Sequence, residues 1–449
     1  MRQVWKVTSH ATRGILMWLP TVLLAVVLAA VAGVLAPFGA GLAGASPVTP
    51  GSLIVSTGGT DVGNCQSSPC LTLGYALTQS GPDDHIVIRP GTYPESNNAN
   101  VVGPTLTGLS ISSLGSAGST AIDATGNSNG ILIEANGVSV TGLTVENANL
   151  EGILAEPPVS TWPTTSSSPA ANISGLTIAN NRVVNNDKAY NPAGPAMDEC
   201  PTSPTDPDDC GEGLHLLGVS SSQVTGNIVS NNVGGILVSD GGLLPSSASP
   251  PAPFNNGTPV GPAADNVIAD NTSTSNAFDC GITLPGHDPF AVTLPTSGST
   301  PGQPQPTVAG VYGNQVLNNV SDNNGAAGLL DATPYPGTGS YDNVFSGNSA
   351  SGNGNAGFTL HSHAPFQDVS GISVSGNKFG TNNLTGDPDT GVSATTGIML
   401  FSAVVPTTVT VTGNAVLSNV NGIAYNDNIT LVASDNHPFA NVTNQLFPF

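Results

Sequence analysis

Short stretches in which apolar and polar residues alternate recur along most of the chain, and polar corners separate them. Many of these stretches begin with a glycine, as in GLHLLG at 213, GILVSD at 235, GFTLHS at 357 and GIMLFS at 397. Alternation with a period of two is typical of β-strands, and the repeats lack the 3.6-residue period of a helix. The pattern therefore predicts an all-β chain of many short strands.

Pairs of asparagines five residues apart mark the corners between these strands. The first asparagines of the pairs are predicted to form one series: Asn181, Asn227, Asn271, Asn314, Asn348, Asn377 and Asn414. The second is predicted at Asn186, Asn232, Asn276, Asn319, Asn353, Asn382 and Asn419. Asparagine tolerates left-handed backbone conformations, and its amide both donates and accepts hydrogen bonds. Identical asparagines in stacked turns would therefore form hydrogen-bonded ladders.

One such repeat has no buried core of its own, so the repeats must stack to bury their inward side chains. This arrangement is a parallel β-helix, whose ends need caps against open edge pairing. The best helical candidate in the repeat region and its flanks lies between Leu71 and Gly81, and we expect it in the N-terminal cap. A strand and turn, HIVIRPGTYPE, follow it, and Leu143 takes the place of the first asparagine in an early, weaker turn.

The asparagine ladders resemble the right-handed β-helix repeats of the pectate-lyase-like superfamily, including NosD-type proteins, over roughly residues 53–442. The opening segment, with Cys65, Cys70 and the run from Arg89 to Tyr93, is similar to the N-terminal cap of secreted members. The resemblance implies a right-handed parallel β-helix. It does not select a function, because this fold carries polysaccharide lyases, glycoside hydrolases, uronan epimerases, adhesins and proteins without known chemistry.

The N-terminus predicts export. Arg2, Lys6 and Arg13 precede an apolar run from Ile15 to about Pro37, and a small-residue site ending at Ala45 follows. An uncleaved membrane anchor is the alternative, since the run approaches the about 20 residues that span a bilayer. We expect a signal peptide at 1–45, the cap and first turns at 46–130, repeats with loop insertions at 131–442 and a tail at 443–449. The protein is then secreted or at the cell surface, without stable membrane contact once the signal is cleaved.

The net charge of the chain limits the classes of molecule that we expect it to bind. Beyond position 45 it carries 29 acidic and four basic residues, which gives 4 − 29 = −25. Binding of nucleic acid requires Lys and Arg to neutralise phosphates, so nucleic acid is not an expected partner. The same negative charge argues against strongly polyanionic substrates. The simplest interpretation of this acidity is that it keeps the protein soluble outside the cell.

Five cysteines suit an oxidising compartment. Cys65 and Cys70 are close enough to pair, and so are Cys200 and Cys210. Cys280 is then either a free thiol or a competing partner for Cys210.

Histidines concentrate on one side of the predicted coils. When the strands are aligned on their glycines, outward residues fall in columns, because neighbouring residues in a strand face opposite ways. These columns bring together imidazole and carboxylate groups that would perform acid–base chemistry. The candidate catalytic residues are His215, His361, Asp279, His287 and His363.

Other chemistries stay open. His361 and His363 lie on one side of a strand, as a pair of metal ligands would, although no particular metal is indicated. Hydrolysis of a sugar requires facing carboxylates. Asp279 and Asp331 are candidates on adjacent repeats, but Asp331 falls in a column expected to face inward.

Elimination from a uronic-acid sugar requires positive charge near the sugar carboxylate, and Arg182, Lys188 and Lys378 are few for that purpose. Calcium held by several carboxylates would supply the missing charge. The cofactor therefore stays undefined, with calcium as one candidate.

We expect a protein that binds an extracellular polysaccharide on its loop-bearing side, with processing by a lyase, hydrolase or epimerase reaction as the further option. Insertions that leave the stack usually build such a surface. They are predicted at Glu156–Ala171, Ala189–Asp209, Leu243–Ala264 and Pro285–Pro306. The alternative is a non-catalytic surface or matrix protein that serves as a spacer or adhesin. Convergence of the histidines and Asp279 in one groove would favour chemistry, and scatter would favour the alternative.

Overall fold

The structure, a computed structural model, describes residues 51–165, 167–189, 212–243, 257–293, 304–437, 439–440 and 442–449. All of these belong to one unit of the chain, Ala43–Phe449. The predicted export signal at 1–45 and the predicted Cys200–Cys210 pair lie outside the described residues. Within the described part of the chain, no helix combines the length and apolar character needed to cross a membrane.

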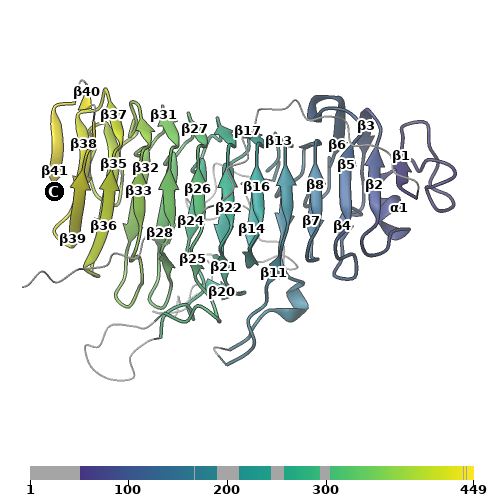
Figure 1. Ribbon diagram of the computed structural model, residues 1–449, viewed down its shortest axis with the longest axis horizontal. Coiled ribbons are helices and arrows are strands. Elements are labelled where there is room, and N and C mark those ends of the chain that lie inside the picture. Colours follow the sequence, from purple (N-terminus) through teal and green to yellow (C-terminus); the bar gives the residue numbers. More distant parts are fainter. Residues whose placement is uncertain are drawn as a thin grey trace, which may run out of the picture. The chain divides into compact units, whose positions relative to one another are not determined.

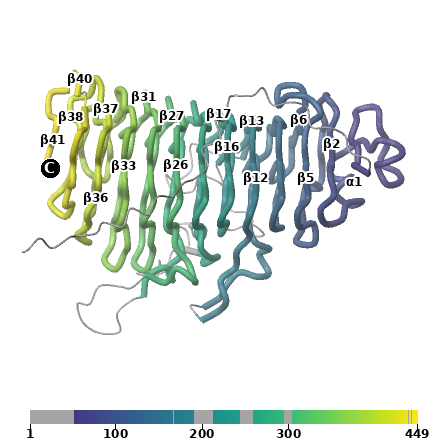
Figure 2. The backbone as a smooth tube through the Cα atoms, in the orientation of Figure 1, coloured from purple at the N-terminus to yellow at the C-terminus, as the bar shows by residue number. Residues whose placement is uncertain are grey.

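Three long parallel sheets form the walls of a right-handed parallel β-helix, as expected from the repeats. Among the described residues, sheet A has 12 strands, and sheets B and C have 11 each. Each coil adds one strand to sheets A, B and C in that order, so neighbours within a sheet come from successive coils. Figures 1 and 2 show the coils stacked in chain order from the N-terminal cap to β41.

The strands of the three sheets are short, as the alternation predicts. Sheet A comprises β1 (Leu53–Val55), β2 (His85–Ile88), β5 (Ser110–Ser113), β8 (Ser139–Thr141), β12 (Thr177–Ala179), β16 (Gln223–Thr225), β22 (Val267–Ala269), β26 (Gln315–Leu317), β30 (Val344–Ser346), β33 (Ser373–Ser375), β36 (Thr407–Thr412) and β39 (Ile429–Ser434). Sheet B comprises β3 (Gly91–Pro94), β6 (Thr120–Asp123), β9 (Thr144–Glu146), β13 (Arg182–Val184), β17 (Ile228–Ser230), β23 (Thr272–Thr274), β27 (Val320–Asp322), β31 (Ser349–Ser351), β34 (Lys378–Phe379), β37 (Ala415–Leu417) and β40 (Phe439–Ala440). Sheet C comprises β4 (Val101–Val102), β7 (Ile131–Ile133), β10 (Ile153–Ala155), β14 (Glu212–Leu217), β18 (Gly234–Ser239), β24 (Ile282–Pro285), β28 (Leu329–Thr333), β32 (Phe358–Ser362), β35 (Thr396–Ser402), β38 (Asn421–Tyr425) and β41 (Asn444–Pro448).

Smaller elements lie at the corners and in the insertions. Two parallel groups extend corners next to sheet A, and one antiparallel pair follows β18. The groups are β11 (Ile173–Ser174) with β15 (Val219–Ser220), β21 (Ala263–Ala264) with β25 (Val311–Tyr312) and β29 (Ser340–Tyr341), and β19 (Gly241–Leu243) with β20 (Gly257–Pro259). Two 3-10 turns are η1 (Ala117–Ser119) and η2 (Val159–Thr161). At the other end, β41 pairs with β38 inside the segment expected as a tail.

Apolar side chains from all three sheets fill one continuous core inside the coils. On β14, Leu214 and Leu216 belong to this core, whereas His215 between them points outward. The predicted glycine alignment is confirmed, because His215 lies opposite Leu237 in the next coil. Each coil covers its neighbour, so the core exists only in the stack.

The N-terminal cap contains the predicted helix, α1 (Leu73–Thr78), and the predicted Cys65–Cys70 disulfide. The carboxylate of Glu95 accepts hydrogen bonds from the backbone N–H groups of Leu73 and Gly74, at 2.7 and 3.2 Å. These N–H groups begin the helix and lack partners within it. The cap is thereby tied to the turn that follows β3.

Buried asparagines form the predicted ladders at the corners. In each step, the Oδ1 of one asparagine accepts from the backbone N–H of the asparagine in the preceding coil, as between Asn227 and Asn181 at 3.0 Å. It also accepts from the Nδ2 group of that asparagine, at 3.1 Å in this pair, in every step except the one from Asn382 to Asn419. One ladder contains Asn181, Asn227, Asn271, Asn319, Asn348, Asn377, Asn414 and Asn436. The second contains Asn186, Asn232, Asn276, Asn324, Asn353, Asn382 and Asn419.

The predicted assignment of asparagines to ladders was wrong in the fourth repeat. Asn314, placed in the first series, belongs to a third ladder with Asn266 and Asn343. Asn319, placed in the second series, belongs to the first ladder. Asparagines recur every five residues here, so two frames fit the sequence, and pairing with neighbouring coils selects the one shifted by five. The replacement by Leu143 is confirmed, since its N–H donates to Asn181.

The described parts of three predicted insertions lie between strands of sheet C and sheet A, after β10, β18 and β24, whereas the insertion Ala189–Asp209 lies almost entirely outside the described residues. In Figure 1, the segment between β10 and β11 and the segment around β20 project from the same side of the stack. Sheet C is therefore the wall that insertions flank, and its outer face is where a site would be built.

Candidate functional site

The predicted catalytic residues do not meet in one groove on sheet C. His215 lies on β14 and His361 on β32, with β18, β24 and β28 between them. At about 4.8 Å per strand, four strand spacings amount to about 19 Å. His215 and His287 both contact the end of β18, whereas His361 and His363 form a second group.

His215 belongs to a buried polar network. Its Nε2 atom lies 2.7 Å from the hydroxyl oxygen of Ser239, and its Nδ1 atom lies 3.9 Å from Oε1 of Glu151. Hydroxyl, imidazole and carboxylate in this order can activate a serine. However, the exposed fractions of His215, Ser239 and Glu151 are 0%, 0% and 1%. The order of groups is present, but no substrate reaches the hydroxyl in this conformation.

His287 and Asp240 fasten the insertion that follows β24. The Oδ1 atom of Asp240 accepts from the backbone N–H groups of His287 and Asp288, at 2.7 and 3.0 Å, and Oδ2 accepts from Gly310 at 2.7 Å. Nδ1 of His287 lies 3.1 Å from the carbonyl oxygen of Gly241. Burial raises the pKa of both Asp240 and Asp288, and these carboxyls act as internal anchors of the loop.

Asp279 and Asp331 do not face each other as a carboxylate pair. Asp279 is half-buried before β24, and its Oδ1 accepts from the N–H of Cys280 at 2.6 Å. Asp331 is fully buried, and its Oδ2 accepts from Nδ2 of Asn343 at 3.0 Å inside the coil. The expectation that Asp331 faces inward is confirmed. Cys280 is a buried free thiol.

The second group surrounds His361 at the end of β32. Its Nε2 atom lies 3.0 Å from Oδ2 of Asp387, and its Nδ1 atom lies 3.3 Å from Oδ2 of Asp389. Nε2 of His363 lies 3.9 Å from the same Asp389 oxygen. The ring of Phe401 on β35 packs against both imidazoles, with centroid distances of 5.8 and 5.9 Å.

The two imidazoles of this group differ in the direction of their pKa shifts. Burial lowers the pKa of His361, but the two aspartates on its nitrogens outweigh that effect and raise the pKa to about 9. Burial, and then the positive charge of His361, lower the pKa of His363. The hydrogen bond from His361 also holds the pKa of Asp389 below its usual value. At neutral pH in the metal-free protein, His361 is a cation and His363 is a neutral base that is one-third exposed.

Asp387 and Asp389 were missed by sequence reasoning. They lie in the segment between β34 and β35, in the run Gly386-Asp387-Pro388-Asp389. Oδ1 of Asp387 accepts from the N–H groups of Asp389 and Thr390, at 3.0 and 3.2 Å, which makes the turn compact. An Asp-Pro-Asp run between glycines signals such a turn, but it does not say which strand the turn will meet.

A groove made of two adjoining clefts lies beside β4, β7 and the residue that follows β10, with Val101, Leu132 and Glu156 in the lining of the smaller cleft. Two clefts, of about 600 and 230 Å³, share Glu134 as a lining residue. Trp162 lines the larger cleft and Glu156 lines the smaller one. Glu134 and Glu156 directly follow opposite residues of neighbouring strands, Ile133 and Ala155, so they lie side by side.

Amide side chains in the groove are oriented by the next coil. The Oδ1 atoms of Asn98, Asn129 and Asn136 each accept a backbone N–H, at 2.7, 3.1 and 2.7 Å. Their Nδ2 groups donate to no acceptor among the described residues. The ring of Trp162 is fixed by its Nε1 donating to the carbonyl of Pro157 at 2.9 Å. The groove thus offers one oriented donor, Asn136, in the cleft that the half-buried indole of Trp162 lines, and two more, Asn98 and Asn129, in the adjoining cleft.

These groove residues were not predicted as site residues. The early coils lack the full asparagine pairs, so the repeat alignment placed no column through Glu134. The available signal was the proline-rich insertion at Glu156–Ala171, which carries Trp162.

Comparison with known proteins gives matches among solved structures alone. No protein-family model matches the chain, and no curated protein matches its sequence. Among solved structures, the A-module of a mannuronan C-5 epimerase from Azotobacter vinelandii is 12% identical, with a TM-score of 0.49 over 87% of this chain and 97% of that one. The chain has a right-handed parallel β-helix fold.

Two further solved structures share this β-helix arrangement. An alginate lyase from Paenibacillus is 15% identical, with a TM-score of 0.36 over 84% of this chain and 98% of that one. The pectate lyase Pel9A is 11% identical, with a TM-score of 0.39 over 88% of this chain and 79% of that one. At these identities the likeness concerns the fold alone, and function must be argued from the β-helix's own side chains.

Proposed function

We propose that the protein binds a neutral extracellular polysaccharide in the groove beside β4, β7 and β10. The proposal is supported by three oriented amide donors along the two clefts, with Asn136 in the cleft that Trp162 lines and Asn98 and Asn129 in the adjoining one. Sugar rings present hydroxyl groups at their edges and C–H groups on their faces. Amides bind the hydroxyls, and an indole packs against the apolar face.

The charge of the groove favours a neutral sugar. Its described lining residues include the carboxyl groups of Glu134 and Glu156 and no Lys or Arg. A uronic-acid chain would bring further negative charge into this site without a cation to offset it.

A second candidate function is hydrolysis of the bound chain. Glu134 and the largely buried Glu156 follow opposite residues of neighbouring strands and both line the smaller cleft, and hydrolysis of a glycoside requires two such carboxyl groups on either side of the bond. Burial raises the pKa of Glu134, which suits a proton donor to the leaving oxygen. The catalytic role expected for the five histidine and aspartate residues stays a prediction beside this one.

The test is affinity electrophoresis of the protein through gels that contain neutral or uronic-acid polysaccharides, together with an assay for newly released reducing ends. We expect retardation by a neutral polysaccharide and weaker retardation for Trp162→Ala and Asn136→Ala. Glu134→Gln should keep binding and lose hydrolysis. Glu146→Gln on sheet B is the matched control and should change neither.

Retardation only by uronic-acid chains would overturn the choice of a neutral ligand. Unchanged retardation in both groove variants would place binding elsewhere on the protein. Absence of retardation by every polysaccharide would favour the spacer or adhesin function.

A further inference from the structure

We propose that His361, His363 and Asp389 bind a divalent transition-metal ion at the C-terminal end of the sheet C face. One nitrogen from each imidazole and one carboxylate oxygen all lie within 4.8 Å of one another. His361 and His363 are two residues apart at the end of β32, so their side chains leave the same face. Asp389 approaches them from the segment before β35.

The spacing of the three groups is close to that of a tetrahedral site, since no two of the ligand atoms are more than 4.8 Å apart. Ligands about 2.1 Å from one tetrahedral ion are about 3.4 Å from each other. Oδ2 of Asp389 lies 3.3 Å from Nδ1 of His361 and 3.9 Å from Nε2 of His363. Small side-chain rotations would therefore bring all three atoms to one ion.

The surroundings already hold the ligands in place. Nε2 of His361 is hydrogen-bonded to the buried carboxylate of Asp387, which leaves Nδ1 directed at Asp389. Metal-bound histidines commonly make such a contact through their other nitrogen, because it fixes the tautomer and the ring orientation. Phe401 packs against both rings, and the turn that carries Asp389 is closed by its own hydrogen bonds.

The donor set selects the class of ion. Two imidazoles and one carboxylate suit zinc, cobalt, nickel or copper, whereas calcium and magnesium prefer oxygen ligands alone. The side chains of His363 and Asp389 are 33% and 48% exposed. A fourth coordination position would therefore face outward, where water or a ligand group can occupy it.

This site is independent of the proposed polysaccharide groove. β10 and β32 are five strand spacings apart in sheet C, or about 24 Å. Loss of metal binding would leave the polysaccharide groove untouched, and a failed polysaccharide test would leave the metal site untouched.

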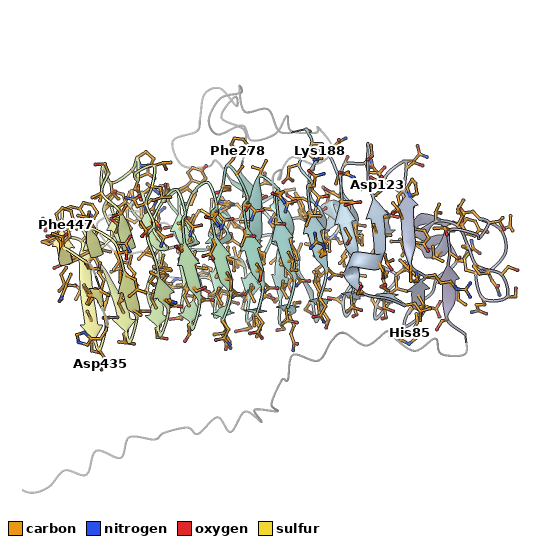
Figure 3. All side chains as sticks on the ribbon, turned by 90° about the horizontal axis from the view of Figure 1, so that it is seen from above. His85, Asp123, Lys188, Phe278, Asp435 and Phe447 are labelled. Carbon is orange, nitrogen blue, oxygen red and sulfur yellow. A yellow bond between two sulfur atoms is a disulfide. The ribbon has the colours of Figure 1, made fainter. Side chains whose placement is uncertain are left out.

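The experiment is a titration of the purified, chelator-treated protein with Zn²⁺, followed by isothermal calorimetry. We expect one ion per chain, and we expect His363→Ala and Asp389→Asn each to weaken binding at least about tenfold. His85→Ala is the matched control, because His85 is exposed on β2, near the opposite end of the stack from Phe447 (Figure 3). It should bind Zn²⁺ as the unmodified protein does.

Co²⁺ provides a second readout, because its visible absorption reports tetrahedral coordination. We expect strong bands for the unmodified protein and their loss in His363→Ala, with unchanged circular dichroism showing that the fold is retained. Ca²⁺ in excess should not displace Co²⁺. Zn²⁺ affinity that survives both ligand substitutions, or that His85→Ala lowers equally, would overturn the proposal.

Discussion

Nδ2 of Asn348 donates to Oδ1 of Asn377 in the next coil across 3.0 Å, and it also donates to the carbonyl of Val316 at 2.9 Å. Oδ1 of Asn348 accepts in turn from the N–H of Asn319 at 2.9 Å. A single amide thus provides partners for buried polar groups of the coils before and after its own. Because buried polar groups without partners are costly, the ladder is what allows polar corners inside the stack.

We expect Asn348→Ala to destabilise the protein by about 2–4 kcal/mol, because it leaves the N–H of Asn319 and the carbonyl of Val316 without their partner. Urea unfolding followed by circular dichroism measures the effect. Asn355→Ala is the control, since Asn355 is half-exposed and its side chain makes no hydrogen bond among the described residues. Equal midpoints for the two variants would contradict the energetic role of the ladder.

Gly235 shows why a glycine opens the strand in each repeat. A Cβ atom there would lie 2.0 Å from the carbonyl oxygen of Gly281 and 2.1 Å from Oγ of Ser273. Gly235→Ala should therefore destabilise the protein by at least about 2 kcal/mol, as an overpacked core does. Gly58→Ala has nothing within 4 Å of its new Cβ and serves as the control in the same unfolding assay. A tolerated Gly235→Ala would show that neighbouring coils separate easily.

The substitution His215→Ala distinguishes a structural role of His215 from a catalytic one. We expect a loss of about 2–4 kcal/mol, because the substitution leaves a cavity and removes the partner of the Ser239 hydroxyl. His85→Ala, at an exposed position, should change stability by less than about 0.5 kcal/mol. If His215→Ala abolished turnover of a polysaccharide and kept full stability, the predicted catalytic role would be established instead. Combining it with His361→Ala tests the two histidines together.

Glu95 predicts a pH dependence of stability. Burial raises its pKa from 4.5 to about 7, although the N–H groups of Leu73 and Gly74 oppose the shift. The folded state therefore holds this proton more tightly than the unfolded state. Its contribution to stability is greatest below about pH 4.5, falls as the pH rises to about 7 and is constant above. The change is on the order of 3 kcal/mol, because each pKa unit corresponds to about 1.4 kcal/mol.

The substitution Glu95→Gln measures the pH-dependent contribution of the Glu95 carboxyl group to stability, because glutamine does not titrate. We expect the difference in melting temperature between the unmodified protein and Glu95→Gln to shift against the unmodified protein between pH 5 and pH 8. A constant difference across that range would show that Glu95 titrates alike in the folded and unfolded states.

Strand positions along sheet C were predictable from local pattern. A glycine followed by alternating residues specifies which side chains face outward, and His215 lies opposite Leu237 as the alignment indicates. The ladder to which each asparagine belongs was less predictable. Asn314 and Asn319 are equally good asparagines five residues apart, and only contact with Asn266 and Asn271 in the preceding coil assigns each to its ladder.

The sequence by itself determined the stacked coils, the outward columns and the shared face of His361 and His363, because alternation and corner residues act over a few neighbouring positions. Only the tertiary structure brought Asp387 and Asp389 to those imidazoles. The position of a turn outside the stack depends on its contacts with other coils, and local pattern does not encode them. For the same reason, the groove beside Trp162 emerged only when its insertion was folded against sheet C.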